Sequence, residues 1–166
     1  MEIERQFLVK REAVLPPLTG VPSTLLRQGY VSFVPEIRVR VWDEARFILT
    51  IKSGAGLSRG EAELEISVEE YTALQERLLP GTQLITKRRY HLPLAGGLTA
   101  ELDVHLEQLD GLRYVEVEFP SEEAARAFVP PPWFGTELTE MTAFSSRLLA
   151  TVSGYEELWE RFPGML

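Results

Sequence analysis

Charged side chains recur at every second residue in several parts of the sequence, and alternate residues of a strand face the same side. The bases at this spacing are Arg38, Arg40, Lys52, Lys87 and Arg89. The acids are Glu2, Glu4, Glu61, Glu63, Asp103, Glu116 and Glu118. Guanidinium and ammonium groups bind phosphate oxygens, and carboxylates suit Mg²⁺ or Mn²⁺. Together they indicate a site for a metal-bound polyphosphate.

An ordinary half-buried sheet also alternates apolar and charged residues. Two features weaken that interpretation. Charges of one sign come in blocks within a strand, whereas a surface kept charged for solubility usually mixes both signs. Every strand keeps the same bias, so one whole face of the sheet would be ionic. In a closed eight-stranded barrel that face becomes an interior just wide enough for side chains or one small ligand.

The elements that must position these residues are short β-strands and a few helices. Alternating or β-rich composition between turn residues predicts strands at approximately 1–9, 25–34, 36–43, 45–53, 60–67, 83–92, 98–106 and 112–119. Capping residues and apolar spacing predict helices at 68–78, 121–128, 143–152 and 153–162. Most connections are too short for helical crossovers. We therefore expect one mainly β (α+β) domain over residues 1–166: a closed antiparallel eight-stranded barrel with peripheral and plug helices.

Composition limits the function classes. The 166 residues include 17 Lys and Arg against 25 Asp and Glu, a formal charge of −8, which argues against a surface that tracks nucleic acid. Without cysteine there is no disulfide framework, thiolate zinc site or cysteine nucleophile. No apolar run is long enough to span a membrane, and the acidic start does not resemble a signal peptide. We expect a soluble cytoplasmic protein.

An ordered set of motifs resembles the CYTH proteins, also called triphosphate tunnel metalloenzymes. The opening Glu2-Ile3-Glu4-Arg5-Gln6 is similar to their E-x-E-x-K signature. The likeness continues collinearly to about residue 150 through segments 26–30, 37–40, 49–52, 59–63, 101–104, 115–119 and 132–139. One such motif would be weak, whereas the ordered set is specific.

The resemblance implies a tunnel whose bases grip a triphosphate and whose acids hold a divalent metal. The implied phosphate ligands are Arg38, Arg40, Lys52, Lys87 and Arg89, with Arg147 a basic candidate in the plug helix. The implied metal ligands are Glu2, Glu4, Asp103, Glu116 and Glu118, with Glu61 and Glu63 nearby, and Glu2, Glu4, Glu116 and Glu118 are the catalytic candidates. The implied reaction is phosphoryl transfer from a triphosphate to water, assisted by Mg²⁺ or Mn²⁺. Inorganic tripolyphosphate is the substrate that the resemblance favours most.

Gln6 occupies the position of the signature lysine, and an amide donates hydrogen bonds without neutralising phosphate charge. This leaves a non-catalytic binder of a triphosphate or polyphosphate as an alternative, beside a thiamine triphosphatase or an adenylate cyclase. His105 shares a face with Asp103, but a lone histidine at a strand end is more often simply hydrogen-bonded or solvated. Because few helices are available to cover the apolar outer faces, we also expect a homodimer formed through a strand face.

Overall fold

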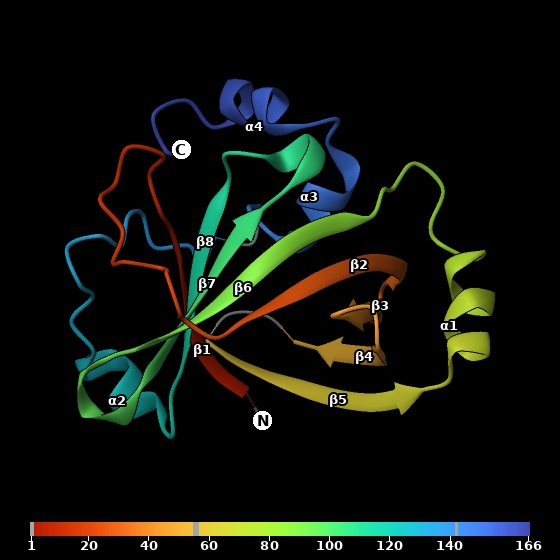
Figure 1. The fold of residues 1–166 in the computed structure, drawn as a ribbon, viewed down its shortest axis with the longest axis horizontal. Helices are drawn as coiled ribbons and strands as arrows, with labels where there is room; N and C mark the ends of the chain where they lie inside the picture. Colours follow the sequence, from red (N-terminus) through yellow and green to blue (C-terminus); the bar gives the residue numbers. More distant parts are fainter. Residues whose placement is uncertain (1, 55–56, 142) are drawn as a thin grey trace.

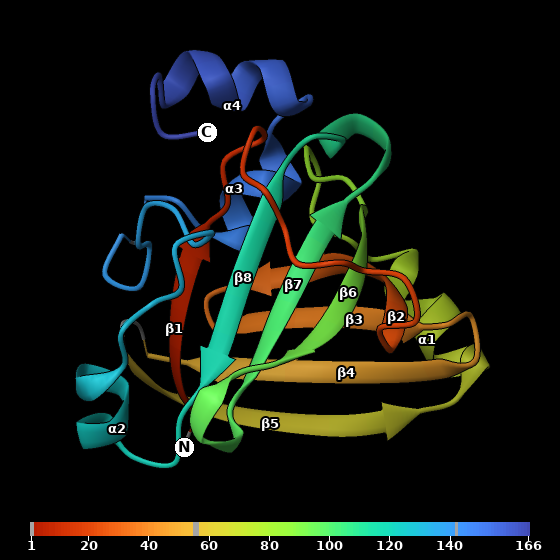
Figure 2. The same ribbon diagram turned by 60° about the vertical axis from the view of Figure 1, so that its left-hand side comes forward.

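The computed structural model describes residues 2–54, 57–141 and 143–166, and its main feature is a ring of eight antiparallel strands (Figures 1 and 2). The strands are β1 (Glu2–Leu8), β2 (Ser23–Phe33), β3 (Glu36–Trp42), β4 (Arg46–Ser53), β5 (Ser58–Ile66), β6 (Ile85–Pro93), β7 (Thr99–His105) and β8 (Arg113–Glu118). Their order around the ring is β1-β5-β4-β3-β2-β6-β7-β8. The prediction of eight antiparallel strands is confirmed.

The ring closes unevenly. Strand β1 pairs with β8 over five positions, from Glu4 to Leu8. On its other side β1 pairs with β5 at only two positions, Glu2 with Arg59 and Ile3 with Ser58, whereas β3 and β4 pair over seven. The word "closed" in the prediction therefore slightly overstates the β1–β5 seam: the sheet curls around, and its last junction is short.

Local sequence explains the turns that bring the strands together. Asp43 and Glu44, which separate β3 from β4, both have left-handed backbone with φ of 49° and 58°. Two consecutive left-handed residues match the twist of a tight hairpin, and aspartate is among the residues that tolerate them. The Asp43 carboxylate also accepts a hydrogen bond from the backbone N–H of Leu25 at 2.8 Å. Between β6 and β7, the short 3₁₀ turn η1 (Ala95–Gly97) contains Gly96 with φ of 74°.

Four α-helices lie outside or at the end of the ring: α1 (Val68–Gln75), α2 (Glu122–Ala127), α3 (Ser146–Thr151) and α4 (Tyr155–Arg161). All four occur where the sequence predicts them, although each is shorter than expected. Ser67 begins α1 with the predicted capping box, because its hydroxyl accepts from the Glu70 N–H and Glu70 reaches back. Ser121 caps α2 with its hydroxyl, which accepts from the Ala124 N–H. A second 3₁₀ turn, η2 (Glu107–Leu109), joins β7 to β8.

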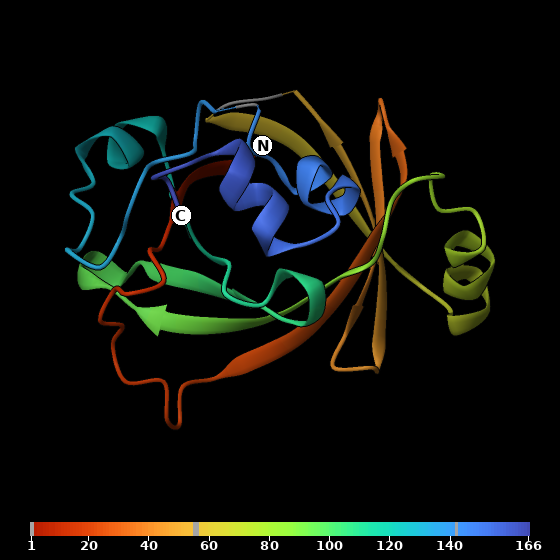
Figure 3. The ribbon, with the colours of Figure 1, turned by 90° about the horizontal axis from the view of Figure 1, so that it is seen from above.

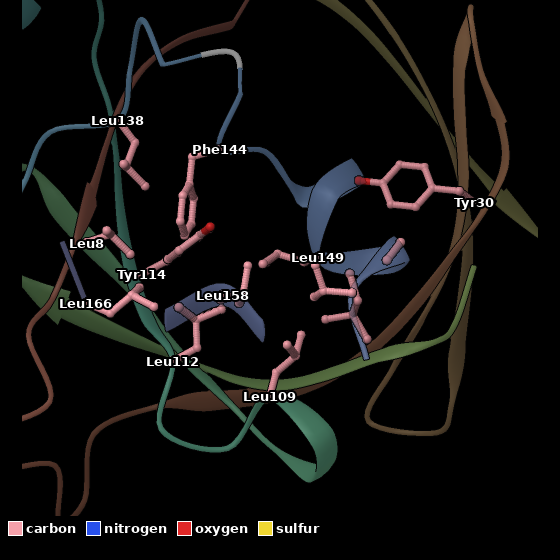
Figure 4. Close-up of a cluster of buried hydrophobic side chains, with 13 residues drawn as sticks. Leu8, Tyr30, Leu109, Leu112, Tyr114, Leu138, Phe144, Leu149, Leu158 and Leu166 are labelled. Atoms are coloured by element: carbon pink, nitrogen blue, oxygen red, sulfur yellow. The ribbon is translucent and has the colours of Figure 1, made fainter. Parts of the chain in front are cut away.

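One apolar cluster fills an end of the ring, where α3 and α4 cover the opening (Figure 3). It joins strand residues such as Tyr30 and Tyr114 to Leu149 of α3 and Leu158 of α4. Figure 4 shows Tyr30 pointing from β2 toward α3, with Tyr114 and Phe144 on the other side of the cluster. The C-terminal helices thus pack against the strands. That residues 1–166 form one domain stays a prediction.

A second apolar cluster covers the outside of half the ring. It consists of outward residues of β1, β7 and β8, including Phe7, Leu102 and Val115, packed under α2 and the loop that contains Phe134. The outer face of β4 and β5 is covered less, since Ile51 is 36% and Leu64 is 55% exposed. Among the described helices, none is long and apolar enough to cross a membrane.

Candidate active site

The ionic faces of the strands turn inward and enclose a cavity of about 220 Å³. Its described wall presents five bases, Arg38, Arg40, Lys52, Lys87 and Arg89, and eight carboxylates, Glu2, Glu4, Glu36, Glu61, Glu63, Glu101, Glu116 and Glu118. The structure therefore brings together eleven of the thirteen residues that the sequence nominates for phosphate or metal. Asp103 and Arg147 are the two nominated residues that do not line the cavity.

Asp103 lies behind the wall, with no exposed surface, and holds two bases in place. Its Oδ1 accepts from Arg89 Nε at 2.7 Å and its Oδ2 from Arg89 Nη2 at 2.8 Å, while Lys87 Nζ also donates to Oδ2. Burial opposes ionisation of Asp103, but Arg89 and Lys87 outweigh it and hold its pKa well below the usual range. Because both carboxylate oxygens are engaged, Asp103 is placed to orient Lys87 and Arg89.

Arg89 connects this buried anchor to the cavity. Its Nη2 also donates to Glu116 Oε2 at 2.6 Å, and its Nη1 contacts Glu101. Burial lowers the pKa of a guanidinium, but Asp103, Glu116 and Glu101 together raise that of Arg89 well above its ordinary value. The pKa of neighbouring Lys87 is lowered, chiefly by burial. Strands β6, β7 and β8 thus hold two bases in fixed positions among carboxylates.

The opposite wall carries a second set of ion pairs. Lys52 Nζ on β4 lies 2.6 Å from Glu61 Oε2 on β5 and 3.0 Å from Glu2 Oε2 on β1. Burial raises the pKa of Glu2. Burial also opposes ionisation of Glu61, but its interactions with Glu2 and Lys52 outweigh burial and lower the pKa of Glu61 to about 2. Glu2 and Glu61 therefore divide into a carboxyl that holds its proton more readily and one that stays ionised.

Arg38 and Arg40 lie side by side on the face of β3 that points inward. Arg40 pairs with Glu63 and donates to Thr50 Oγ1 at 3.2 Å. Burial, together with the charge of Arg38, lowers the pKa of Arg40 to about 10. Arg38 is only 8% exposed, and within the described parts of the chain it makes no ion pair and its Nε has no acceptor. A buried cation in this condition fits an anionic ligand.

Gln6 stands between two carboxylates of the wall. Its Nε2 donates to Glu4 Oε1 at 2.9 Å and to Glu116 Oε1 at 3.2 Å. Glu118, the remaining predicted acid of β8, is exposed and pairs in register with Glu4. Over the residues that the structure describes, no three acidic or histidine side chains are already arranged as a metal-ligand set. The carboxylates are instead held by bases and by Gln6.

Arg147 lies beside the cavity, where its Nε donates to Glu36 Oε2 at 2.9 Å and its side chain is 40% exposed. Its role as a phosphate ligand stays a prediction. His105 is buried, 3.2 Å from the Leu112 carbonyl through Nδ1 and edge-on to Tyr114. Burial and the charge of Lys87 lower its pKa to about 4. His105 is thus a neutral interior side chain at neutral pH, as its position at a strand end suggested.

Sequence reasoning did not nominate five residues that line the cavity: Glu36, Trp42, Glu101, Ser145 and Ser146. Alternation carries a signal for three of them, because Glu36 and Trp42 share the parity of Arg38 on β3, and Glu101 shares that of Asp103 on β7. The two serines belong to the segment that begins α3, and their approach to the cavity depends on how that segment folds over the end of the ring. Strand periodicity contains no signal for them.

This chain is similar in sequence to a known domain family and to two enzymes. The sequence model of the CYTH domain family matches residues 1–142. An inorganic triphosphatase of Nitrosomonas europaea is 43% identical over 155 residues, which are 90% of this chain and 96% of that protein. An inorganic triphosphatase of Acetivibrio thermocellus is 36% identical over 140 residues, 83% of this chain and 85% of that protein.

Solved structures agree with the sequence relatives. A crystal structure of an inorganic triphosphatase, 38% identical, matches with a TM-score of 0.67 over 93% of this chain and 97% of that one. A Hippeastrum protein, only 19% identical, shares the fold with a TM-score of 0.56 over 76% of this chain and 83% of its own.

Proposed function

Because this chain belongs to the CYTH domain family, we propose that it hydrolyses a triphosphate inside the barrel cavity, with inorganic tripolyphosphate as the substrate. The observation that carries the proposal is the cavity wall itself, where five bases converge on a space of about 220 Å³ among eight carboxylates. The names of the two relatives above 35% identity support the choice of an inorganic triphosphate.

The five bases of the wall are placed to bind phosphate oxygens in different ways. Arg38, buried and without an ion pair among the described residues, offers its guanidinium to the phosphates without first losing a carboxylate. Arg40 and Lys52 exchange part of their contact with Glu63 and Glu61 for phosphate oxygens. On the opposite wall Lys87 and Arg89 are held by Asp103 and approach the same space. Positioning and neutralisation of charge are most of what phosphoryl transfer needs.

The wall also fits a hard divalent cation. Its acidic donors are carboxylate oxygens, which Mg²⁺ and Mn²⁺ prefer, and they outnumber the bases. We assign Glu2, Glu4, Glu116 and Glu118 as the metal-binding and catalytic carboxylates, with Glu61 and Glu63 near a second position. When bound there, the cation supplies charge neutralisation and Lewis acidity toward phosphate oxygens. Asp103 is better assigned as the residue that positions Lys87 and Arg89, since it has no exposed surface and does not line the cavity.

The proposed reaction transfers a terminal phosphoryl group to water. The water oxygen forms a bond to the terminal phosphorus, the bond from that phosphorus to the bridging oxygen breaks, and the products are phosphate and diphosphate. Arg38, Arg40 and Arg89 stabilise the charge on the phosphate oxygens during transfer. An ionised carboxylate of the wall accepts the proton that the attacking water loses.

A turnover screen tests the assignment of substrate class. Phosphate release is followed from tripolyphosphate, thiamine triphosphate and ATP, each with Mg²⁺, Mn²⁺ or EDTA, and cyclic AMP is measured in the ATP reactions. We expect fastest metal-dependent release from tripolyphosphate. Faster release from thiamine triphosphate or ATP would move the assignment to that substrate, and cyclic AMP formation would make the chain a cyclase.

One observation favours a second candidate, a protein that binds a triphosphate without cleaving it. Gln6 contributes no positive charge between Glu4 and Glu116, so the cavity has one base fewer than the signature would supply. Tight metal-dependent binding of tripolyphosphate without release of phosphate would select this alternative. Appearance of turnover in Gln6→Lys would then identify Gln6 as the cause.

We further propose a homodimer through the outer face of β4 and β5. Leu49 of β4 pairs in register with Leu64 of β5, and Ile51 lies two residues farther along on the same face. Ile51 and Leu64 are the large apolar residues exposed there. Burial of such a face against a second copy removes apolar surface from water. A cytoplasmic location stays a prediction from the sequence.

A further inference from the structure

The side-chain amide of Gln6 ties two carboxylates of neighbouring strands together. Glu4 lies two residues earlier on β1, and Glu116 is opposite Gln6 in the β1–β8 register. Gln6 Nε2 donates to one oxygen of each, at 2.9 and 3.2 Å. A primary amide has two N–H donors, so this nitrogen serves both carboxylates at once and holds them on either side of itself.

The backbone of Gln6 is fixed on the edge away from β8. Its N–H donates to Thr139 Oγ1 at 3.1 Å, and its carbonyl accepts from the Leu138 N–H at 2.7 Å. Leu138 and Thr139 belong to segment 135–139, which crosses β1 and is called the crossing segment. It includes Gly135, where a Cβ would come 2.6 Å from the Leu8 carbonyl oxygen. Only glycine allows this close approach. The crossing segment therefore fixes β1 at Gln6, and the side chain faces the cavity.

The contacts of Gln6 satisfy hydrogen bonds but cancel no charge. Among the described residues, the ion-pair partner of Glu116 is Arg89, which contacts its other oxygen at 2.6 Å. The whole described wall already has eight carboxylates against five bases. A triphosphate entering this cavity meets an excess of negative charge near β1 and β8, which a protein base at position 6 would have reduced.

We propose that Gln6 is a positioning residue that holds Glu4 and Glu116 as a pair for a divalent cation, and so makes triphosphate binding depend on that cation. This inference rests on the proposed function and deepens it. A lysine at position 6 would contact the same two carboxylates, repel the cation and offer positive charge directly to phosphate. The residue type at this position therefore sets how tightly binding of the anion is coupled to binding of the cation.

The test compares Gln6→Lys with wild type and with Gln75→Lys, which adds the same charge at the exposed end of α1. Mn²⁺ alone is titrated by calorimetry, and tripolyphosphate is then titrated with Mg²⁺ or with EDTA. Gln6→Lys should weaken Mn²⁺ binding by roughly tenfold or more, and should bind tripolyphosphate in EDTA more tightly than wild type. Gln75→Lys should match wild type in both titrations.

Gln6→Met separates the hydrogen bonds from the charge, because it keeps the chain length and removes both donors. It should weaken Mn²⁺ binding several-fold and leave tripolyphosphate binding metal-dependent; thermal unfolding checks that each variant is folded. Equal Mn²⁺ affinity in wild type, Gln6→Lys and Gln6→Met would overturn the inference, even if wild type binds tripolyphosphate with Mg²⁺. A different result would overturn the proposed function and leave the role of Gln6 in cation binding: Mn²⁺ affinity that falls in Gln6→Lys and Gln6→Met, with no binding of tripolyphosphate to wild type under any condition.

Discussion

Asp103 and Arg89 form a two-pronged ion pair across β6 and β7, with Arg89 Nε on Oδ1 at 2.7 Å and Nη2 on Oδ2 at 2.8 Å. The carboxylate has no exposed surface, while the guanidinium continues to Glu116 at the cavity wall. A buried anion thus fixes the direction of a base whose other side faces the cavity. The first prediction concerns this pair.

Asp103→Asn should strongly destabilise the protein. It leaves Arg89 and Lys87 buried without their shared carboxylate, and the expected loss is about 3–5 kcal/mol in the free energy of unfolding. Glu101→Gln is the control, because Glu101 contacts the same Arg89 but is 36% exposed and should cost less than about 1 kcal/mol. Urea denaturation measures both. Similar small losses in the two variants would show that Asp103 is not the anchor.

Arg38→Gln should separate stability from binding. Arg38 forms no ion pair among the described residues and burial opposes its charge, but Tyr30 and nearby carboxylates raise its pKa, so its removal should lower the free energy of unfolding modestly, by about 1–2 kcal/mol. Calorimetric binding of tripolyphosphate with Mg²⁺ should weaken by roughly tenfold or more. Arg126→Gln, which removes an exposed ion pair with Glu122 on α2, should change neither quantity. Unchanged affinity for tripolyphosphate in Arg38→Gln would contradict the role of Arg38 as a phosphate ligand.

His105 should make stability fall on mild acidification. Burial lowers its folded pKa to about 4 from 6.5, so between these values the unfolded chain binds a proton that the folded protein does not. The free energy of unfolding attributable to His105 should therefore fall by about 3 kcal/mol as pH drops from 6.5 to 4. The measurement is urea denaturation of wild type and His105→Asn across this range, since effects of the carboxylates are common to both. Parallel curves would contradict the assignment.

Leu64→Glu should leave the barrel folded and separate the proposed dimer. The side chain is 55% exposed on the outer face of β5, so a charge there is tolerated in one copy but is buried between two. Sedimentation equilibrium should give the mass of a dimer for wild type and of a monomer for the variant. Val129→Glu, which also replaces an exposed aliphatic side chain and lies beyond α2 at 84% exposure, is the control. A monomeric wild type would refute the dimer.

Alternation predicted the fold and most of the site because a barrel wall has two faces and a period of two separates them. Glu2, Arg40 and Lys87 all reach the cavity as their parity requires. Parity gives direction but not depth, so it could not show that Asp103 is sealed behind Lys87 and Arg89. Arg147 and Ser146 depend on how the segment before α3 crosses the end of the ring, a tertiary arrangement without a local pattern. The short β1–β5 seam likewise follows from register, which composition does not fix.

The most direct test of the central claim is a ³¹P NMR record of tripolyphosphate incubated with the wild-type protein. The protein is incubated with tripolyphosphate and either Mg²⁺ or Mn²⁺, and the metal is removed before the spectrum is recorded. The spectrum should then show phosphate and diphosphate formed in equal amounts. A parallel incubation in EDTA should show tripolyphosphate unchanged. Intact tripolyphosphate after incubation with either metal would contradict hydrolysis in this cavity.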